Sequence, residues 1–361
     1  MNRQGFPVPI RGRGAASNPD SRYAELVRES FDDGWASDEP VEEAPRTELI
    51  IDHARSVIAR NDSPDVPFSQ SINPYRGCEH GCAYCFARPS HAYLGLSPGL
   101  DFETKIAWKP DAPECLLREL GRRAYVCSPI APIALGINTD AYQPVERRLR
   151  LTRRLLEILA ETRHPVSIVT KSALIERDRD VLADMARDGL VQVMFSVTTL
   201  DGALARSLEP RAARPQRRLE ALRSLSDAGI PCGVLCAPLI PAVNDHELEA
   251  VFAAAAEAGA RSAGYVLLRL PREVGPLFRA WLEAWYPDRA EHVYSLMRQA
   301  HGGREYDARF GERMRGQGAY ADMLAQRARL ARRRFRLDQD LPPLNCSRFR
   351  PPSVSGQGEL F

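Results

Sequence analysis

Three cysteines stand close together in the sequence, in the spacing C-x₃-C-x₂-C: Cys78, Cys82 and Cys85. A thiolate is both a nucleophile and a metal ligand, so a cluster of thiols in one short segment indicates metal chemistry. Gly77 and Gly81 lie beside the cysteines and permit backbone angles that other residues resist. Three thiolates on such a loop are able to converge on one metal centre.

Two kinds of metal centre fit three thiolates, a zinc site and an iron–sulfur cluster. They differ in whether the protein must supply a fourth ligand. A structural zinc site requires a fourth ligand, normally from a second Cys or His pair, and no such pair follows. His80 and His91 are candidate fourth ligands, but their spacings are unusual for zinc. A [4Fe–4S] cube held by three thiolates leaves one iron open to bind another ligand. The residues favour the iron–sulfur cluster and leave zinc as the alternative.

Around the cysteine motif the sequence alternates apolar runs with amphipathic helical patterns. The runs are continuous, which is typical of strands that are covered on both faces. We count about six β/α units, two fewer than a complete barrel, so the sequence predicts an α/β fold, a partial (β/α)6 TIM-like barrel. Functional residues of such a fold lie at the carboxyl ends of the strands. Strands are expected near residues 69–75, 132–137, 166–171, 191–197, 231–240 and 263–270, and helices over 145–162, 175–187, 215–228, 245–258 and 273–284.

Composition divides the chain into three parts. Residues 1–45 are rich in Pro, Gly, Ser and charged groups and cannot offset their ordering entropy by burial, so we expect a disordered tail. Residues 46–340 are expected to form the barrel domain, which ends in an Arg-rich helical extension over 326–336. Residues 341–361 are expected to form a second, flexible tail.

The overall composition is that of an ordinary soluble protein, with 44% apolar and 27% charged residues and a formal net charge of +2. Global charge therefore indicates no particular partner. The amino-terminal residues lack the apolar segment of a secretory signal, and no run of about 18 apolar residues predicts a membrane span. We expect a cytoplasmic protein with no membrane partner. Because the cytosol keeps thiols reduced, its eight cysteines should form no disulfide framework.

The cysteine motif also carries a family resemblance. The segment around it, RGCEHGCAYCFAR, resembles the signature of radical S-adenosylmethionine (SAM) enzymes, including Tyr84 before the third cysteine and Phe86 after it. The later segments GINTDAYQPVE and VTKS are similar to the spore photoproduct lyase-like (DNA repair photolyase-like) branch of that family. The resemblance covers roughly residues 68–285, and the family's partial barrel agrees with the count of β/α units.

The resemblance implies cofactors and a reaction. Cys78, Cys82 and Cys85 would hold a [4Fe–4S] cluster whose open iron binds S-adenosyl-L-methionine. One electron, from a donor such as flavodoxin or ferredoxin, would then cleave SAM into methionine and a 5′-deoxyadenosyl radical. The protein would hold SAM, exclude water and direct the radical to one C–H bond.

The resemblance also implies a set of SAM-binding residues. Tyr84 would pack on the adenine, and Phe86 belongs to the same signature. The family's Gly-Gly-Glu motif is replaced here by a segment in which Thr139 and Asp140 offer oxygen acceptors for the methionyl ammonium group. That segment is equally well explained as a turn and helix N-cap. At the ends of the next two strands, a cation and two hydroxyls would contact the SAM carboxylate and ribose: Lys171, Ser196 and Thr198.

The reaction class depends on a fourth cysteine. In spore photoproduct lyase a cysteine that follows the cluster returns a hydrogen atom to the product radical, and Cys127 lies at a similar distance past the motif, although the surrounding residues differ. The leading hypothesis is a radical SAM lyase that acts on damaged DNA. One alternative is a radical SAM enzyme for a protein or small molecule, and another is a non-catalytic, metal-bearing protein that binds nucleic acid.

The carboxyl-terminal residues suggest a partner. Gln357, Leu360 and Phe361 resemble the short peptide by which bacterial DNA-repair proteins bind the sliding clamp. Two large apolar side chains at the end of a polar tail are well used only if a pocket receives them, on the clamp or on the barrel itself. Arg-rich stretches at 146–154 and 326–336 could contact phosphates or be solvated helix faces.

Overall fold

The computed structural model describes residues 10–24 and 46–352. Its main feature is a seven-stranded sheet in the order β10-β9-β8-β7-β6-β3-β2, and a second sheet has the order β1-β5-β4. The described strands are β1 (Glu48–Ile51), β2 (Ile58–Arg60), β3 (Gln70–Ile72), β4 (Tyr75–Arg76), β5 (Lys105–Trp108), β6 (Ile133–Leu135), β7 (Val166–Thr170), β8 (Val191–Ser196), β9 (Cys232–Leu239) and β10 (Ser262–Leu267).

The main sheet is the partial barrel that the sequence predicts. Strands β3, β6, β7, β8, β9 and β10 pair in parallel, and only β2 is antiparallel to its neighbour within the described sheet. In the described residues β10 and β2 are not paired with one another, so the sheet curves without closing. The carboxyl ends of all six parallel strands therefore share one edge.

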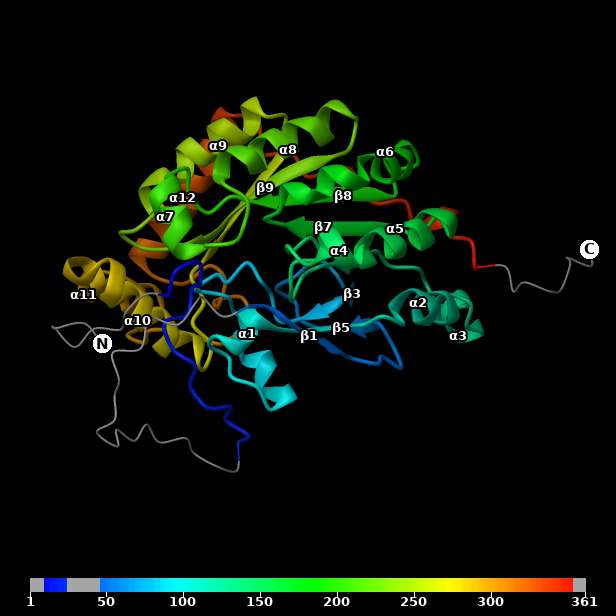
Figure 1. The fold of residues 1–361 in the computed structure, drawn as a ribbon. Coiled ribbons are helices and arrows are strands. Elements are labelled where there is room, and N and C mark those ends of the chain that lie inside the picture. The colour runs from blue at the N-terminus through cyan, green and yellow to red at the C-terminus, as the bar shows by residue number, and fades with distance from the viewer. Residues whose placement is uncertain (1–9, 25–45, 353–361) are drawn as a thin grey trace, which may run out of the picture.

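Helices connect the strands and cover the outer face of the sheet, where Figure 1 shows α8 and α9 above β9. None of the described helices is long and apolar enough to cross a membrane. The α-helices are α1 (Asp101–Thr104), α2 (Ala112–Leu120), α3 (Arg123–Val126), α4 (Glu146–Leu149), α5 (Leu151–Glu161), α6 (Arg179–Arg187), α7 (Gly202–Leu208), α8 (Pro215–Asp227), α9 (Leu248–Glu257), α10 (Val274–Trp285), α11 (Ala290–Ala300) and α12 (Ala319–Arg334).

The long parallel strands form because alternate apolar side chains are fully buried in the core. In β8, Val191, Val193 and Phe195 are buried in the same core cluster as Leu155 and Leu159 of α5. The spacing of these leucines places them on the face of α5 that packs on the sheet. Burial of each side chain contributes about 1.5–3 kcal/mol, so this layer stabilises the fold.

Two features depart from the predicted elements. The helix expected over 145–162 is divided into α4 and α5 at Arg150, whose φ of 51° is left-handed and interrupts the helical hydrogen bonds. The small sheet β1-β5-β4 was not predicted. Its β5 runs parallel to β1 and antiparallel to β4. Strands β1 and β4 precede the cysteine motif, and β5 lies between the motif and β6.

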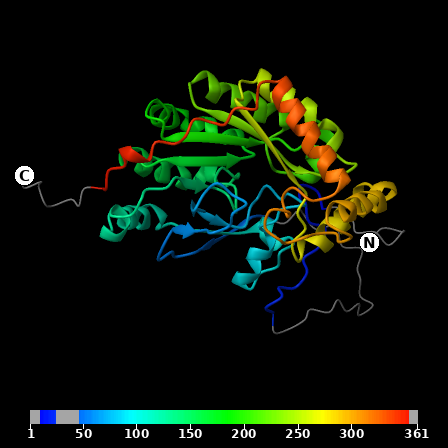
Figure 2. The ribbon, with the colours of Figure 1, turned by 180° about the vertical axis from the view of Figure 1, so that it is seen from behind.

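Residues 337–350, which we call the C-terminal strap, run past the amino ends of the strands. Ala263 at the start of β10 donates its N–H to Leu337 O, Asn345 donates to Gly189 O ahead of β8, and Arg350 donates to Thr162 O ahead of β7. Figure 2, which views the molecule from behind, shows this red segment crossing in front of the sheet. The flexible tail expected from residue 341 is therefore ordered as far as residue 352, while residues 357–361 lie outside the described residues.

Candidate active site

The three cysteines lie on a loop, residues 77–86, that follows β3 and β4 at the carboxyl edge of the sheet; we call it the cluster loop. Its shape depends on two glycines with positive φ, Gly77 (81°) and Gly81 (65°). A Cβ on Gly77 would lie 2.9 Å from Phe102 O, and one on Gly81 would lie 2.6 Å from Glu103 Oε2. Only glycine fits at these two positions, because both the backbone angle and the space exclude a side chain.

The three thiols are close enough to act on one another electrostatically. Cys78 and Cys82 are buried, Cys85 is half-buried, and all three are free. Burial, together with the charges of neighbours that include the other two thiols, raises the pKa of Cys78 well above its usual range, and burial raises the pKa of Cys82 to about 12. A metal centre would replace the thiol protons and supply the positive charge that these buried sulfurs lack.

The residues present fit an iron–sulfur cube. Among the described residues no three His, Cys, Asp or Glu side chains converge on a single ion, as a mononuclear zinc site requires. A cube has a different requirement, since each thiolate binds a different iron atom. Of the candidate zinc ligands, His80 has its Nδ1 3.4 Å from Asp140, and His91 packs on Phe102.

A buried ion pair between Arg88 and Glu103 supports the backbone of the cluster loop. Arg88, which is fully buried, donates from Nε and Nη2 to Cys82 O at 3.0 and 2.9 Å. Its Nη1 donates to Pro98 O and Gly99 O, and its Nη2 donates to Glu103 Oε1 at 2.5 Å. All of these bonds are charge-assisted, so Arg88 fixes the position of Cys82 strongly.

Residues 10–24, which we call the N-terminal arm, also contact Glu103 and the cluster loop. Gly14 N–H and Ala15 N–H donate to the two carboxylate oxygens of Glu103 at 3.1 and 2.8 Å. A Cβ on Gly14 would lie 1.7 Å from Gly81 O, so the two backbones touch. This part of the predicted disordered tail is thus ordered, because a buried carboxylate far along the chain satisfies its N–H groups.

A second charged group lies at the carboxyl ends of β7 and β8. The carboxylate of Glu209 accepts hydrogen bonds from the hydroxyls of Tyr84 and Thr198 and pairs with Arg218. Burial alone would raise the pKa of Glu209, but the charges of Arg218 and Lys171 lower it to about 2. Tyr84, Thr198, Glu209 and Arg218 are buried, and Lys171 is half-buried. Together they form a fixed array of polar and charged side chains next to the cluster loop.

Lys171 brings a cation to this array. Its Nζ lies 5.7 Å from the centre of the Tyr84 ring. Burial opposes its charge, but Cys82 and Glu209 favour it, and the net result is a raised pKa for Lys171. The structure therefore brings together three of the predicted cofactor residues, Tyr84, Lys171 and Thr198. It adds Glu209 and Arg218, which the sequence analysis missed because neither stands in a recognisable motif.

The two predicted ammonium acceptors already have protein partners. Thr139 Oγ1 donates to Tyr75 O at 2.8 Å. The carboxylate of Asp140 accepts from Thr170 Oγ1, Lys171 N and Tyr142 N, each at 2.8 Å. The hydrogen bonds of Asp140 thus connect the end of β6 to the end of β7 beside the cluster loop. These contacts are also those expected of a residue that stabilises a turn.

The two remaining cofactor candidates differ in their surroundings. Ser196 Oγ donates to Ala237 O at 3.0 Å, so it joins β8 to β9 at the carboxyl edge. Phe86 is 41% exposed, and the guanidinium of Arg269 lies 4.9 Å from its ring centre. Phe86 therefore lies on the rim of the cluster loop rather than in the buried array.

Cys127 lies at the opposite edge of the sheet. It ends α3 and is exposed. Two residues earlier, the hydroxyl of Tyr125 bonds to Gln70 Oε1 at 2.9 Å and to His164 Nε2 at 2.8 Å, at the amino ends of β3 and β7. Since the cluster loop follows the carboxyl end of β3, Cys127 is separated from it by the depth of the sheet. This placement offers no support for a catalytic role of Cys127, and that role stays a prediction.

The fold and the cluster loop define the class of protein. The chain belongs to the radical SAM superfamily, whose family model matches residues 72–255. This confirms the predicted family, with its [4Fe–4S] cluster and SAM as cofactors.

Solved structures and curated relatives add particular similarities. The chain is similar to spore photoproduct lyase complexed with dinucleoside spore photoproduct, at 16% identity and a TM-score of 0.56 over 80% of this chain and 79% of that chain. A variant of that enzyme with bound AdoMet and dinucleoside spore photoproduct aligns at 18% identity and 0.53, over 80% and 78%. An uncharacterised protein of Mycobacterium tuberculosis is 35% identical over 236 residues, 65% of this chain and 68% of the relative. A protein of Methanocaldococcus jannaschii is 28% identical over 177 residues, 49% and 62% of the two chains.

Proposed function

We propose that this radical SAM enzyme acts on a nucleic acid, as a lyase for damaged DNA in the cytoplasm. The observation that carries the proposal is the extent of the similarity to spore photoproduct lyase. The family model spans only residues 72–255, whereas the likeness to the lyase covers 80% of this chain and 79% of the other. The shared fold thus includes parts that lie outside the cofactor domain, where a substrate would be recognised.

When bound, the cluster and SAM supply a one-electron cleavage that yields methionine and a 5′-deoxyadenosyl radical. Cys78, Cys82 and Cys85 would hold the cluster. Lys171 would pair with the SAM carboxylate, because its ammonium group lies 5.7 Å from the ring centre of Tyr84 in the cluster loop. Glu209 would keep Tyr84 in place through the hydroxyl of that tyrosine.

Partners follow from the same proposal. The cluster needs one electron for each cleavage, and a small electron-transfer protein such as flavodoxin or ferredoxin would supply it. The last five residues, 357–361, would bind the bacterial sliding clamp and keep the enzyme near DNA. A fluorescent peptide of residues 350–361 titrated with clamp tests this second point. Micromolar binding that is lost when Leu360 and Phe361 are both changed to Ala supports it, and no binding at high micromolar clamp contradicts it.

The function is tested by anaerobic reconstitution and a paired assay. SAM cleavage is measured with ultraviolet-irradiated DNA and with the same DNA before irradiation, and the DNA is then analysed by mass spectrometry. The proposal expects a damage-dependent change in the DNA and 5′-deoxyadenosine as a product. Cleavage of SAM with no change in either DNA would instead favour a protein or small-molecule substrate.

A further inference from the structure

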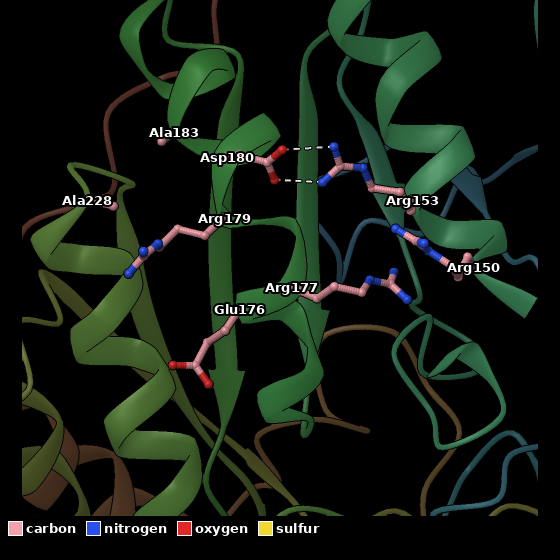
Figure 3. Close-up of a pocket in the computed structure, with 8 residues that line it drawn as sticks. All are labelled: Arg150, Arg153, Glu176, Arg177, Arg179, Asp180, Ala183 and Ala228. Carbon is pink, nitrogen blue, oxygen red and sulfur yellow. Dashed lines mark hydrogen bonds and ion pairs between the residues drawn. The ribbon is translucent and has the colours of Figure 1, made fainter. Parts of the chain in front are cut away.

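Two pockets in the described residues are lined by arginines, and they differ in charge balance. The pocket in Figure 3 lies between the outer helices, and there Asp180 faces Arg153 with both carboxylate oxygens. Arg177 in the same pocket pairs with Glu146 and Asp178. Two of its four arginines are therefore paired with carboxylates of the protein itself.

The second pocket, which we call the loop pocket, has a volume of about 640 Å³ and opens beside the cluster loop. Its residues come from the N-terminal arm, the start of β1, the region of α4 and the segment after α7. Within the described structure its lining includes one acidic residue, Glu79, and five arginines: Arg11, Arg13, Arg46, Arg148 and Arg211.

The loop pocket is built directly on the cluster loop. Arg211 N–H donates to His80 O at 3.3 Å, and its Nη2 lies 3.0 Å from Glu79 Oε1. Thr47 Oγ1 donates to the same carboxylate oxygen at 2.7 Å. Glu79 immediately follows Cys78, so a molecule in the pocket would lie next to the metal-binding segment.

The arginines of the loop pocket crowd positive charge together. Arg13 is only 9% exposed, and burial together with the charge of Arg211 lowers its pKa, although the carboxylates of Glu103 and Glu79 act in the opposite direction. On the rim, Arg11, Arg46 and Arg148 are exposed to solvent. An anion that entered would lower the repulsion among these groups, and guanidinium groups match the oxygens of a phosphate in pairs.

We propose that the loop pocket binds backbone phosphates of the nucleic acid on which the enzyme acts. The inference rests on the proposed function and adds the place where the substrate is held. A phosphodiester is favoured over an acidic protein surface because the arginines line a recess. The basic side chains that line the recess are arginines, whose guanidinium groups can contact phosphate oxygens in pairs. Bound there, the strand would lie beside the cluster loop, next to Glu79.

The test compares DNA affinity and its salt dependence in three reconstituted full-length proteins. Fluorescence anisotropy with a labelled duplex is measured from about 50 to about 200 mM salt for the wild type, Arg148→Ala and Arg148→Ala with Arg211→Ala. The slope of log affinity against log salt should fall by about one for each arginine removed. Iron content is measured alongside, because Arg211 contacts Glu79 and its loss could disturb the cluster loop. If the double variant loses iron, the salt slope of Arg148→Ala alone still decides the test, because Arg148, unlike Arg211, forms no hydrogen bond or ion pair with Glu79 in the described structure.

The matched control is Arg150→Ala with Arg179→Ala, which removes the same charge from the outer pocket of Figure 3. Its salt slope should equal that of the wild type. Equal slopes for the loop-pocket variants and the wild type would overturn the proposal while leaving a nucleic-acid substrate in place. A second result would also overturn the proposal. The loop-pocket variants would keep the wild-type salt slope but cleave SAM more slowly when flavodoxin supplies the electron, and at the normal rate when dithionite supplies it. That result would assign the pocket to the electron donor.

A wild type that binds no DNA would instead refute the proposed function. In that case inorganic tripolyphosphate, titrated against the same proteins by intrinsic fluorescence, decides the nature of the pocket. Binding that Arg148→Ala weakens would support a phosphate site, and no binding to the wild type would overturn it.

Discussion

Gly14→Ala tests how the N-terminal arm holds the cluster loop. The new Cβ would lie 1.7 Å from Gly81 O and 2.9 Å from Gly81 C. Both are backbone atoms, so no side-chain rotation relieves the clash, and the arm must move away from the loop. The change is therefore expected to undock residues 13–15 even though it adds only one methyl group.

The size of the effect follows from the contacts that are lost. Gly14 N–H and Ala15 N–H donate to the carboxylate of Glu103, and hydrogen bonds to charged groups contribute about 1.5–3 kcal/mol each. Losing both costs roughly 3–6 kcal/mol, while Glu103 keeps its ion pair with Arg88. For a chain of this length we expect the Tm to fall by roughly 4–8 °C.

Thermal unfolding and cluster stability measure the result. Gly202→Ala is the matched control, because nothing lies within 4 Å of its new Cβ, and it should be neutral or slightly stabilising. The reconstituted Gly14→Ala protein should also lose its iron–sulfur absorbance faster in air, since the arm covers Gly81. A Tm and an air half-life equal to those of the wild type would refute the argument that the arm clamps the loop.

Four further changes have distinct expected outcomes. Cys82→Ala should remove most bound iron and all 5′-deoxyadenosine formation, and full SAM cleavage would contradict the cluster assignment. Lys171→Met should weaken SAM binding roughly tenfold or more while iron content stays normal, because one charge-assisted contact is lost; calorimetry measures it. Cys127→Ala should turn over like the wild type, since the residue lies at the amino edge, and a stalled product would restore its catalytic role. Arg218→Met leaves Glu209 buried without its ion pair and should cost about 3–5 kcal/mol in denaturant unfolding. The pKa of Glu209 is about 2 in the folded protein, against an ordinary 4.5. The contribution of this carboxylate to stability is therefore complete above pH 4.5 and is lost as the pH falls toward 2. The wild-type Tm should decline across that range, and the decline should be smaller in Arg218→Met.

The barrel could be predicted from the sequence because its signal is local. The runs that became β7, β8 and β9 are short and mostly apolar, which is enough to predict buried strands, although β7 and β8 also contain polar residues such as Ser167 and Gln192. The break at Arg150 could not be predicted, since nothing in the sequence marks that residue as left-handed. The order of the N-terminal arm could not be predicted either, because its partner, Glu103, lies 89 residues from Gly14.

The site was predicted in part, for a similar reason. The cysteine motif is contiguous, and Tyr84 and Lys171 stand at positions that parallel β/α units place at one edge. The role of Cys127 was inferred from distance along the chain and stays a prediction, because β5, α2 and α3 carry the chain back to the amino edge. Glu209 and Arg218 belong to separate segments, and only their contact in the folded protein makes them a pair.

An open sheet exposes two edges, and an exposed edge strand invites pairing with another molecule. On one side, β10 is covered by its own chain: Leu267 N–H donates to Met314 O, and the start of the strap bridges Ser262 through Asp338. On the other side, β2 is only three residues long and ends in the exposed Arg60. The C-terminal strap therefore covers the start of the β10 edge, and the segment around Met314 covers its end. Removing the strap should produce concentration-dependent association of the barrel before any loss of its chemistry.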